Sequence, residues 1–155
     1  MRSKSIIIFL LLSSIFVFNE RSFAIKGGTN EALKISTSGI LAQKLQLRLS
    51  AENIANASTL RTASGKPYQK KYAIFAADEK GGVKIAAIKK SKEPFKAVYD
   101  PANPLADKNG FVYLPNVNIS EEMVQITMTN VLYEANTTAY KSAKSMYQQS
   151  LDILK

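Results

Sequence analysis

Apolar residues repeat every seven positions near both ends of the chain, and this repeat predicts two long helices. The first pattern runs from Asn30 to about Ala57 and contains no Pro and a single Gly. Thr29 or Asn30 can cap its first turn, so we expect the helix to begin there. Its main apolar column consists of Leu33, Ile40, Leu47 and Ile54, with Leu41, Leu45 and Leu49 beside it.

The second pattern begins at Asn118 and continues to the C-terminus without Gly or Pro. Asn118 followed by Glu121 is typical of a capping box, in which two side chains satisfy each other's free backbone N–H groups. One apolar column contains Ile119, Ile126, Tyr133, Tyr140, Tyr147 and Leu154; the other contains Leu132, Ala139, Met146 and Ile153, with Ala135 and Ala143 beside it.

These columns predict how the helices pack. A sustained seven-residue repeat at both ends indicates helices that lie along one another as a coiled coil. An isolated helix pair buries only one stripe on each helix. The additional apolar columns would then stay exposed and make the pair prone to association. Two interpretations stay open: the extra columns contact neighbouring subunits, or a compact monomeric helical hairpin uses every column internally.

Between the helices, residues 58–117 are predicted to form a small β-rich insert. Residues 58–66 are small and polar and indicate a loop. Alternation over residues 68–76, a turn at 78–82 and alternation over 83–88 predict a β-hairpin. Four prolines then exclude regular helix between residues 93 and 117, where only a short strand at 111–114 is expected. The predicted fold is mainly α with a central β-hairpin and irregular region.

The first 24 residues are typical of a secretory signal peptide. Arg2 and Lys4 precede an apolar run over residues 6–18, which is too short to span a bilayer. The polar segment that follows ends in Ser22-Phe23-Ala24, with small residues where a signal peptidase cleaves. We expect a mature chain, residues 25–155, that is exported and is not an integral membrane protein. The predicted helical segments are then 25–57 and 118–155. An uncleaved amphiphilic anchor is the alternative.

Composition excludes most catalytic chemistry. The 155 residues include no Cys, His or Trp, so neither a catalytic triad with His nor a zinc finger can form. No Gly-rich phosphate-binding loop is present, and Asp107-Lys108-Asn109-Gly110 fits a turn better than a calcium loop. Glu121 and Glu122 are adjacent and cannot converge on one substrate. We expect no enzyme activity, cofactor, metal or small-molecule substrate.

The chain is strongly basic, with 21 Lys and Arg against 12 Asp and Glu and a formal net charge of +9. Such a charge attracts polyanions of several kinds. Basic runs interleaved with aromatic residues, which are typical of nucleic-acid binding, are absent from the sequence, so a nucleic-acid partner is disfavoured. A secreted periplasmic or surface module that binds anionic wall polymer or lipid remains an alternative function.

A set of short segments distributed over both helices and the insert points to a family. These segments are 33–36, 50–57, 99–101, 110–118, 121–123, 133–136 and 143–146. They resemble the flagellar rod and hook proteins, and the central block is similar to the proximal-rod members of that family. The match covers essentially all of residues 30–155. Segments such as Asn53-Ile54-Ala55-Asn56 are shared across the family, whereas the block from Tyr99 to Asn118 is more specific.

The resemblance implies a structural subunit of the flagellar basal body without catalysis. In this family, terminal helices of neighbouring copies pack around an export channel and a β-rich insert faces outward, so the implied partners are other rod subunits and the protein itself. The implied subunit contacts are Asn53, Ile54, Ala55 and Asn56 on the first helix and Tyr133, Ala135 and Asn136 on the second. From the apolar columns we also expect Leu33, Ile40 and Leu47 of the first helix and Ile126, Tyr140 and Tyr147 of the second at subunit contacts. Tyr99, Asp100, Pro101, Pro115, Asn116 and Val117 would shape the connection between the insert and the second helix.

One feature departs from the family pattern. Rod proteins normally lack a cleaved signal and leave the cell through the flagellar type III apparatus, whereas residues 1–24 resemble a general secretory signal. A downstream start is disfavoured because no Met lies between Met1 and Met123. We therefore expect delivery across the inner membrane by the general secretory route and a periplasmic location at the basal body.

Overall fold

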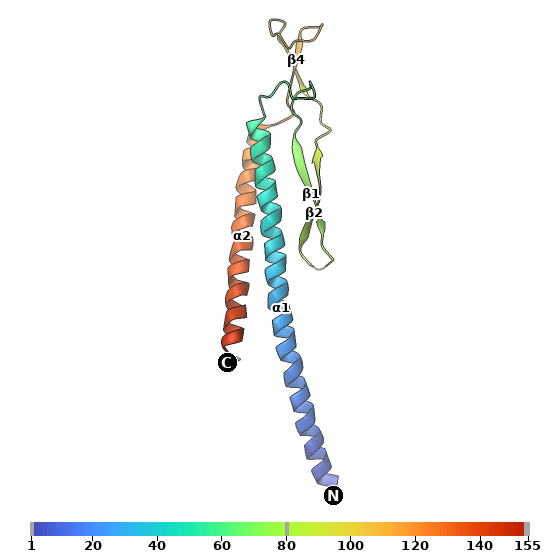
Figure 1. Cartoon of the computed structure of the whole chain (residues 1–155), viewed down its shortest axis with the longest axis vertical. Coiled ribbons are helices and arrows are strands. Elements are labelled where there is room, and N and C mark those ends of the chain that lie inside the picture. Colours follow the sequence, from blue (N-terminus) through green and yellow to red (C-terminus); the bar gives the residue numbers. More distant parts are fainter. Residues whose placement is uncertain (1, 80, 154–155) are drawn as a thin grey trace.

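The computed structural model describes residues 2–79 and 81–153, with side chains described from Gly28 onward. In chain order, two long helices flank a segment with two pairs of short strands. Figure 1 shows this segment along one side of the first helix and beyond the end of the helix pair. This arrangement confirms the predicted pair of terminal helices with a small β insert. The elements are α1 (Arg2–Ala55), β1 (Lys71–Ala77), β2 (Val83–Lys90), β3 (Lys96–Tyr99), β4 (Phe111–Leu114) and α2 (Ile119–Asp152).

Helix α1 is longer than the sequence pattern predicted. It begins at Arg2 and passes through Gly27 and Gly28, so the cap expected at Thr29 or Asn30 is wrong. A helix that is already formed upstream supplies carbonyl acceptors to these residues, and a Gly inside a helix costs only about 1 kcal/mol relative to Ala. Of the predicted signal segment, residues 2–24 lie in this first part of α1. Their side chains and residue 1 are not among the parts of the chain that the structure describes.

Helices α1 and α2 run antiparallel and lie side by side (Figure 1). The approach is close at Gly39, where an added Cβ would lie 2.7 Å from Oδ1 of Asn136. On α2, the half-buried Ile126, Tyr140 and Tyr147 form one contact column. A second column is small or polar and comprises Glu122, Thr129, Asn136 and Ala143, of which all but Asn136 are buried. Leu154, the last member of one predicted apolar column, lies outside the described residues.

The start of α2 is capped differently from the predicted capping box. The Asn118 side-chain oxygen accepts a hydrogen bond from the Ser120 backbone N–H at 3.1 Å. Glu121 binds the Asn118 side-chain amide at 2.9 Å. Asn118 is therefore the cap residue, as predicted. The cap differs from a capping box because Asn118 accepts from the N–H of Ser120 and not of Glu121, and because Glu121 accepts from the side chain of Asn118 and not from its backbone N–H. Two carboxylates in the first turn also suit the positive end of the helix dipole.

The predicted hairpin is confirmed by the pairing of β1 with β2. The strands are antiparallel, with Lys71 opposite Lys90 and Ala77 opposite Val83, and the register shifts between Ile74 and Phe75. Its turn ends in Gly81 and Gly82, both with positive φ. An added Cβ at Gly82 would clash with Oγ of Ser38, and Val83 N–H donates to that oxygen at 3.0 Å. The hairpin tip is thereby fixed against α1.

The expectation that residues 93–117 contain only one strand is wrong. Strand β3 pairs antiparallel with β4 from Lys96 opposite Leu114 to Tyr99 opposite Phe111. Pro94 and Pro101 flank β3 without interrupting it, so its four residues keep their backbone N–H groups. Tyr99 and Phe111 then meet edge to face with ring centroids 5.4 Å apart.

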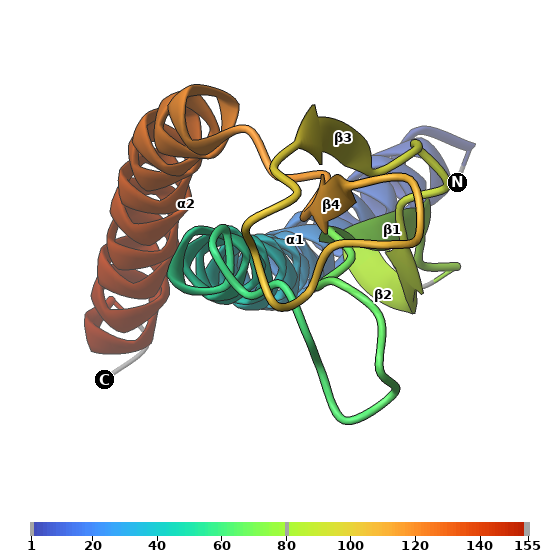
Figure 2. The ribbon, with the colours of Figure 1, turned by 90° about the horizontal axis from the view of Figure 1, so that it is seen from above.

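Helix α1 lies between α2 and the β1–β2 hairpin. Figure 2, which looks along the long axis, shows α2 on one side of α1 and the hairpin on the other. Helix α1 contacts α2, β1 and β2. Consequently α2 and the hairpin each keep a face that points away from the rest of the chain.

Candidate assembly surface

The outward face of α2 carries an apolar stripe. At about 100° per residue, Val131 lies roughly 200° around the helix from Thr129, which is fully buried against α1. Val131 is 63% exposed, and Met128 is 58% exposed on the same side. We call this set the outer stripe, and its members are Val124, Met128, Val131, Leu132, Ala135, Ala139 and Met146.

The outer stripe is also uncharged. Residues 123–133 contain no Asp, Glu, Lys or Arg. From Val124 to Met146 the stripe extends about 33 Å at about 1.5 Å per residue. Exposed apolar patches of this length on a soluble chain are typical of protein–protein interfaces. Within the described residues, the interpretation that every apolar column is used internally does not hold, because this stripe has no covering element.

The predicted interface residues of α1 have a mixed placement. Its main column, Leu33, Ile40, Leu47 and Ile54, is half-buried between α2 and the hairpin. The side of α1 left open carries Lys34, Lys44 and Arg48 together with Leu41, which is 57% exposed. The predicted column of α1 therefore contributes first to the packing of the chain itself.

Asn53, which the family resemblance placed in a subunit contact, makes its contacts inside the chain. It is 1% exposed, and its side-chain oxygen accepts hydrogen bonds from Lys71 N–H at 2.9 Å and from the Tyr68 hydroxyl at 3.0 Å. Its amide nitrogen donates to the Lys71 carbonyl at 2.9 Å. Asn53 thus fixes the start of β1 against the end of α1.

The neighbouring family positions differ from Asn53. Ala55 is exposed, whereas Ile54 and Asn56 are partly buried. The Asn56 amide donates to the Glu52 carbonyl at 2.9 Å, and its oxygen accepts from the Thr59 hydroxyl at 3.2 Å. These bonds close the C-terminal end of α1.

On α2, the predicted contact residues divide between two faces. Ile126, Tyr140, Tyr147 and Asn136 are half-buried, and the Asn136 amide also donates to the Leu132 carbonyl at 2.9 Å. Ala135 is exposed and belongs to the outer stripe. Tyr133 is 36% exposed and lies at the margin of the contact with α1.

A buried ion pair joins the insert to α2. The Lys70 ammonium lies 2.8 Å from Oε1 of Glu122, whose side chain is 4% exposed, and 3.7 Å from Oε2 of Glu121. Partial burial lowers the pKa of Lys70, but the hydrogen bond to Glu122 and the negative charges of Glu122, Glu121 and Glu93 outweigh it and raise this pKa above its ordinary value. Lys71 pairs in the same way with Glu52 of α1.

Tyr68 completes this junction. It is 7% exposed, and burial, followed by the negative charges of Glu52 and Glu122, raises the pKa of Tyr68 to about 12. Alternation placed Tyr68 in the first strand of the hairpin, but the sequence pattern did not identify Tyr68, Lys70 or Glu122 as a junction between the insert and the helices. A seven-residue spacing of small and polar residues, from Glu122 through Thr129 and Asn136 to Ala143, is the sequence feature that could have located the second contact column.

The predicted connection between the insert and α2 has two parts. Tyr99, Asp100 and Pro101 lead into the exposed β3–β4 turn, where Asp100 N–H donates to the Gly110 carbonyl at 2.9 Å. Pro115 is buried, and Val117 is half-buried. Asn116 accepts from Lys70 N–H at 2.8 Å and donates to the Glu93 carbonyl at 2.9 Å, so it joins three segments of the insert.

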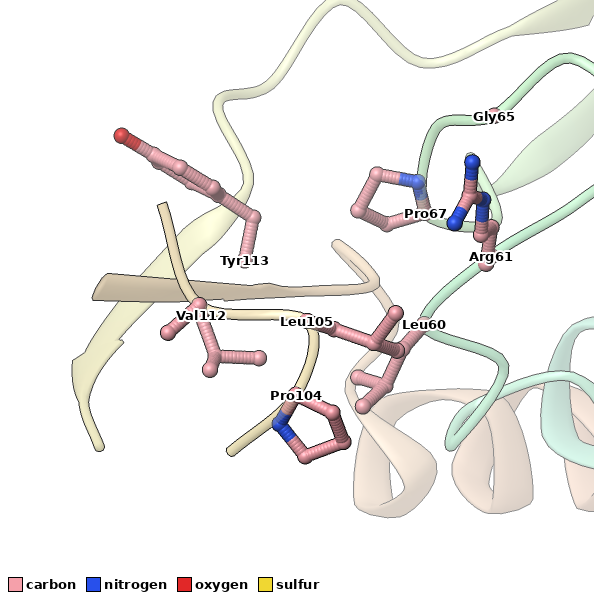
Figure 3. Close-up of a pocket in the computed structure, with 9 residues that line it drawn as sticks. Leu60, Arg61, Gly65, Pro67, Pro104, Leu105, Val112 and Tyr113 are labelled. Carbon is pink, nitrogen blue, oxygen red and sulfur yellow. The ribbon is translucent and has the colours of Figure 1, made fainter. Parts of the chain in front are cut away.

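A shallow cavity of about 340 Å³ lies between the loop after α1 and the β3–β4 region. Figure 3 shows Leu60, Pro67 and Leu105 around it, with Arg61 beside Pro67. Among the residues that line it, Arg61 carries the only charge and Tyr113 the only hydroxyl. In the described part of the chain, His, Cys, Asp and Glu form no group of three or more that could hold a metal ion.

Among the described residues, no helix has a segment both long and apolar enough for a membrane span.

Comparisons with known proteins agree with one another. A family model described as "Flagellar basal body rod FlgEFG protein C-terminal" matches residues 108–153, which include α2 and β4. The flagellar basal-body rod protein FlgC of Borreliella burgdorferi is 40% identical over 149 residues, covering 82% of this chain and 98% of the relative. The FlgC proteins of Salmonella typhimurium and Agrobacterium fabrum are 39% and 38% identical, covering 77% and 80% of this chain and 92% and 94% of the relatives.

Proposed function

Since the chain belongs to the family of flagellar basal-body rod protein FlgC and is a structural subunit of the basal-body rod, we propose that it assembles into the proximal rod through its terminal helices. The outer stripe of α2 is the observation that carries this proposal. It is long, apolar, uncharged and separate from the columns that α2 uses against α1.

The proposed contacts combine both helices. The outer stripe packs against a helix of a neighbouring rod subunit, either a second copy or a related chain. Ala55 and Leu41 lie on the open side of α1 and give a second subunit access to that helix. Two separate open faces allow each subunit to contact neighbours on more than one side, which a closed tube requires.

The insert then has an accessory role in assembly. It is fixed to both helices through Asn53, Lys70 and Lys71. We propose that Pro115, Asn116 and Val117 hold it at a set angle to α2. In the tube, the insert faces outward and the helices line the channel side.

A single charge in the outer stripe tests the proposal. In cells, Val131→Asp is expected to reduce incorporation into purified basal bodies at least about tenfold, because assembly would bury an unpaired carboxylate. Asn130→Asp is the matched control, since Asn130 is the adjacent exposed residue and lies about 100° away on the helix. Normal incorporation of the Val131→Asp chain, with both variants folded by circular dichroism, would overturn the proposal.

Export forms a second part of the proposal. The match with the Borreliella relative covers 98% of that relative but leaves nearly a fifth of this chain outside it. We propose that residues 1–24 are a signal peptide and that the subunit reaches the periplasm by the general secretory route. N-terminal sequencing of the protein from basal bodies is expected to begin at Ile25, and a sequence that begins at Met1 would contradict cleavage.

A further inference from the structure

Positive charge is concentrated in one part of the molecule. Residues 58–117 contain eleven Lys and Arg against five Asp and Glu, whereas residues 118–155 contain three against four. The insert therefore carries nearly all of the excess charge that the mature chain would have.

Within the insert, four exposed lysines form a series that we call the lysine row. Its members are Lys84, Lys89, Lys92 and Lys96. Lys84 and Lys89 pair with Ala76 and Tyr72 and so share one face of the hairpin, whereas Lys90 pairs with Lys71 and lies on the other face.

The lysine row has no ion pair within the described residues. Every ion pair there uses Lys70 or Lys71. Glu93 lies between Lys92 and Lys96 in the sequence, and its charge also acts on Lys70. The row is thus available to an external anion.

The lysine row is extended and not clustered. Strand β2 lies along α1 on the side opposite α2, as Figures 1 and 2 show, and the chain continues from it toward β3. From Lys84 to Lys89 the strand advances about 16 Å at about 3.3 Å per residue. One small anion contacts only part of such a series. A linear polymer with repeated negative charges can follow its length.

The orientation of the row favours a polymer over a bilayer. If the helices run along the tube, as the proposed function requires, the row runs parallel to the tube axis. A membrane that the tube crosses meets the tube edge-on and cannot lie along the row. A polymer that runs beside the tube can lie along the row. We propose that the lysine row binds the polymer of the cell wall through the carboxylates that this polymer carries, and so holds the rod against the wall.

Binding by this row would be electrostatic and sensitive to salt. The Debye length falls from about 10 Å at 0.1 M ionic strength to about 3 Å at 1 M. Exposed lysines therefore lose most of their attraction for the polymer at high salt. A contact that depended on the half-exposed apolar residues of the hairpin, such as Ile85 and Ile88, would persist there.

Co-sedimentation of the purified full chain with cell-wall sacculi tests the proposal. The triple variant Lys84→Gln/Lys89→Gln/Lys92→Gln is expected to lose wall retention at least about tenfold at low salt. The matched control Lys34→Gln/Lys44→Gln/Lys141→Gln removes the same charge from exposed positions on the helices and is expected to stay within about twofold of the unmodified chain. Blocking the wall carboxylates by amidation is expected to reduce retention of the unmodified chain.

Three results would overturn the proposal. Equal losses in the two triple variants would show an effect of net charge alone. Retention that survives high salt would show apolar adsorption. Binding to anionic phospholipid vesicles without binding to sacculi would identify a membrane surface instead.

The proposed rod function is tested separately in the same strains. The lysine-row variant is expected to enter purified basal bodies normally, because none of its three residues lies in the outer stripe. Wall retention can thus fail while rod incorporation succeeds, and incorporation can fail while wall retention persists.

Discussion

The outer stripe of α2 and the lysine row of the insert lie on opposite sides of α1 and differ in chemistry. The stripe is apolar and uncharged, and an exposed apolar surface of this kind is stabilised when another protein covers it. The row is cationic and exposed to solvent. In the proposed assembly, one chain separates the surface it uses for subunit contacts from the surface it presents to its surroundings. Helix α1 contacts both α2 and the β1–β2 hairpin and so fixes the separation of the two surfaces.

Removing a core side chain of α1 should have the largest effect on this arrangement. Leu49 is 2% exposed, and Leu49→Ala is expected to lower the free energy of unfolding by about 3 kcal/mol through lost burial and a residual cavity. Leu41→Ala, on the same helix but 57% exposed, is the control and should change it by less than about 1 kcal/mol. Urea unfolding followed by circular dichroism measures both. Similar losses in the two variants would contradict the described packing of α1.

Breaking the ion pair between the insert and α2 should have the next largest effect. Lys70→Met leaves the Glu122 carboxylate buried without a partner, and we expect a loss of about 2 kcal/mol, since Lys70 itself is partly solvated. Lys89→Met removes an unpaired exposed lysine and should cost less than about 0.5 kcal/mol. The same unfolding assay compares them, and a Lys70→Met chain as stable as the Lys89→Met chain would disprove the role of the pair.

High pH should loosen the same junction more gradually. An unfolded Tyr loses its proton near pH 10, whereas the folded chain holds the proton of Tyr68 until about pH 12. The folded state therefore binds more protons in this window, and the free energy of unfolding falls as the pH rises from 10 to 12. The raised pKa of Lys70 acts in the same direction. Thermal unfolding at several pH values in this range measures the effect. The stability of the Tyr68→Phe chain should decline less with pH than that of the unmodified chain, and equal declines in the two chains would contradict the raised pKa of Tyr68.

The local patterns of the sequence predicted much of the fold. The seven-residue repeat located both helices, and alternation around a Gly-Gly turn located the β1–β2 hairpin. The resemblance also identified the family, which the comparisons confirm. These features are local, so a single sequence displays them directly.

Non-local pairing and polar packing were not predicted. Strand β3 has only four residues, and its partner β4 follows a long turn, so no local alternation marks it. The second contact column of α2 is built from Glu122, Thr129, Asn136 and Ala143, which a search for apolar residues passes over. The start of α1 was misplaced because Thr29 and Asn30 are residue types that favour a helix cap, yet here they lie inside a helix that continues from upstream.

The placement of individual site residues required three-dimensional information. Family resemblance put Asn53 and Asn56 among the proposed subunit contacts, yet their amides are engaged within the chain. The outer stripe, in contrast, contains Ala135 and most of the second apolar column that the sequence had marked. Periodicity identified a second apolar surface, and only the position of α1 decided which of the two columns it covers.

Cysteine labelling tests the central claim most directly, because the native chain contains no Cys. Single Met128→Cys and Lys89→Cys variants place a thiol in the outer stripe and in the lysine row. Both are expected to react with a maleimide in the free chain, and in purified basal bodies Met128→Cys should become at least about tenfold slower while Lys89→Cys remains reactive. Equal reactivity of Met128→Cys in the free chain and in basal bodies would show that no neighbouring subunit covers the stripe.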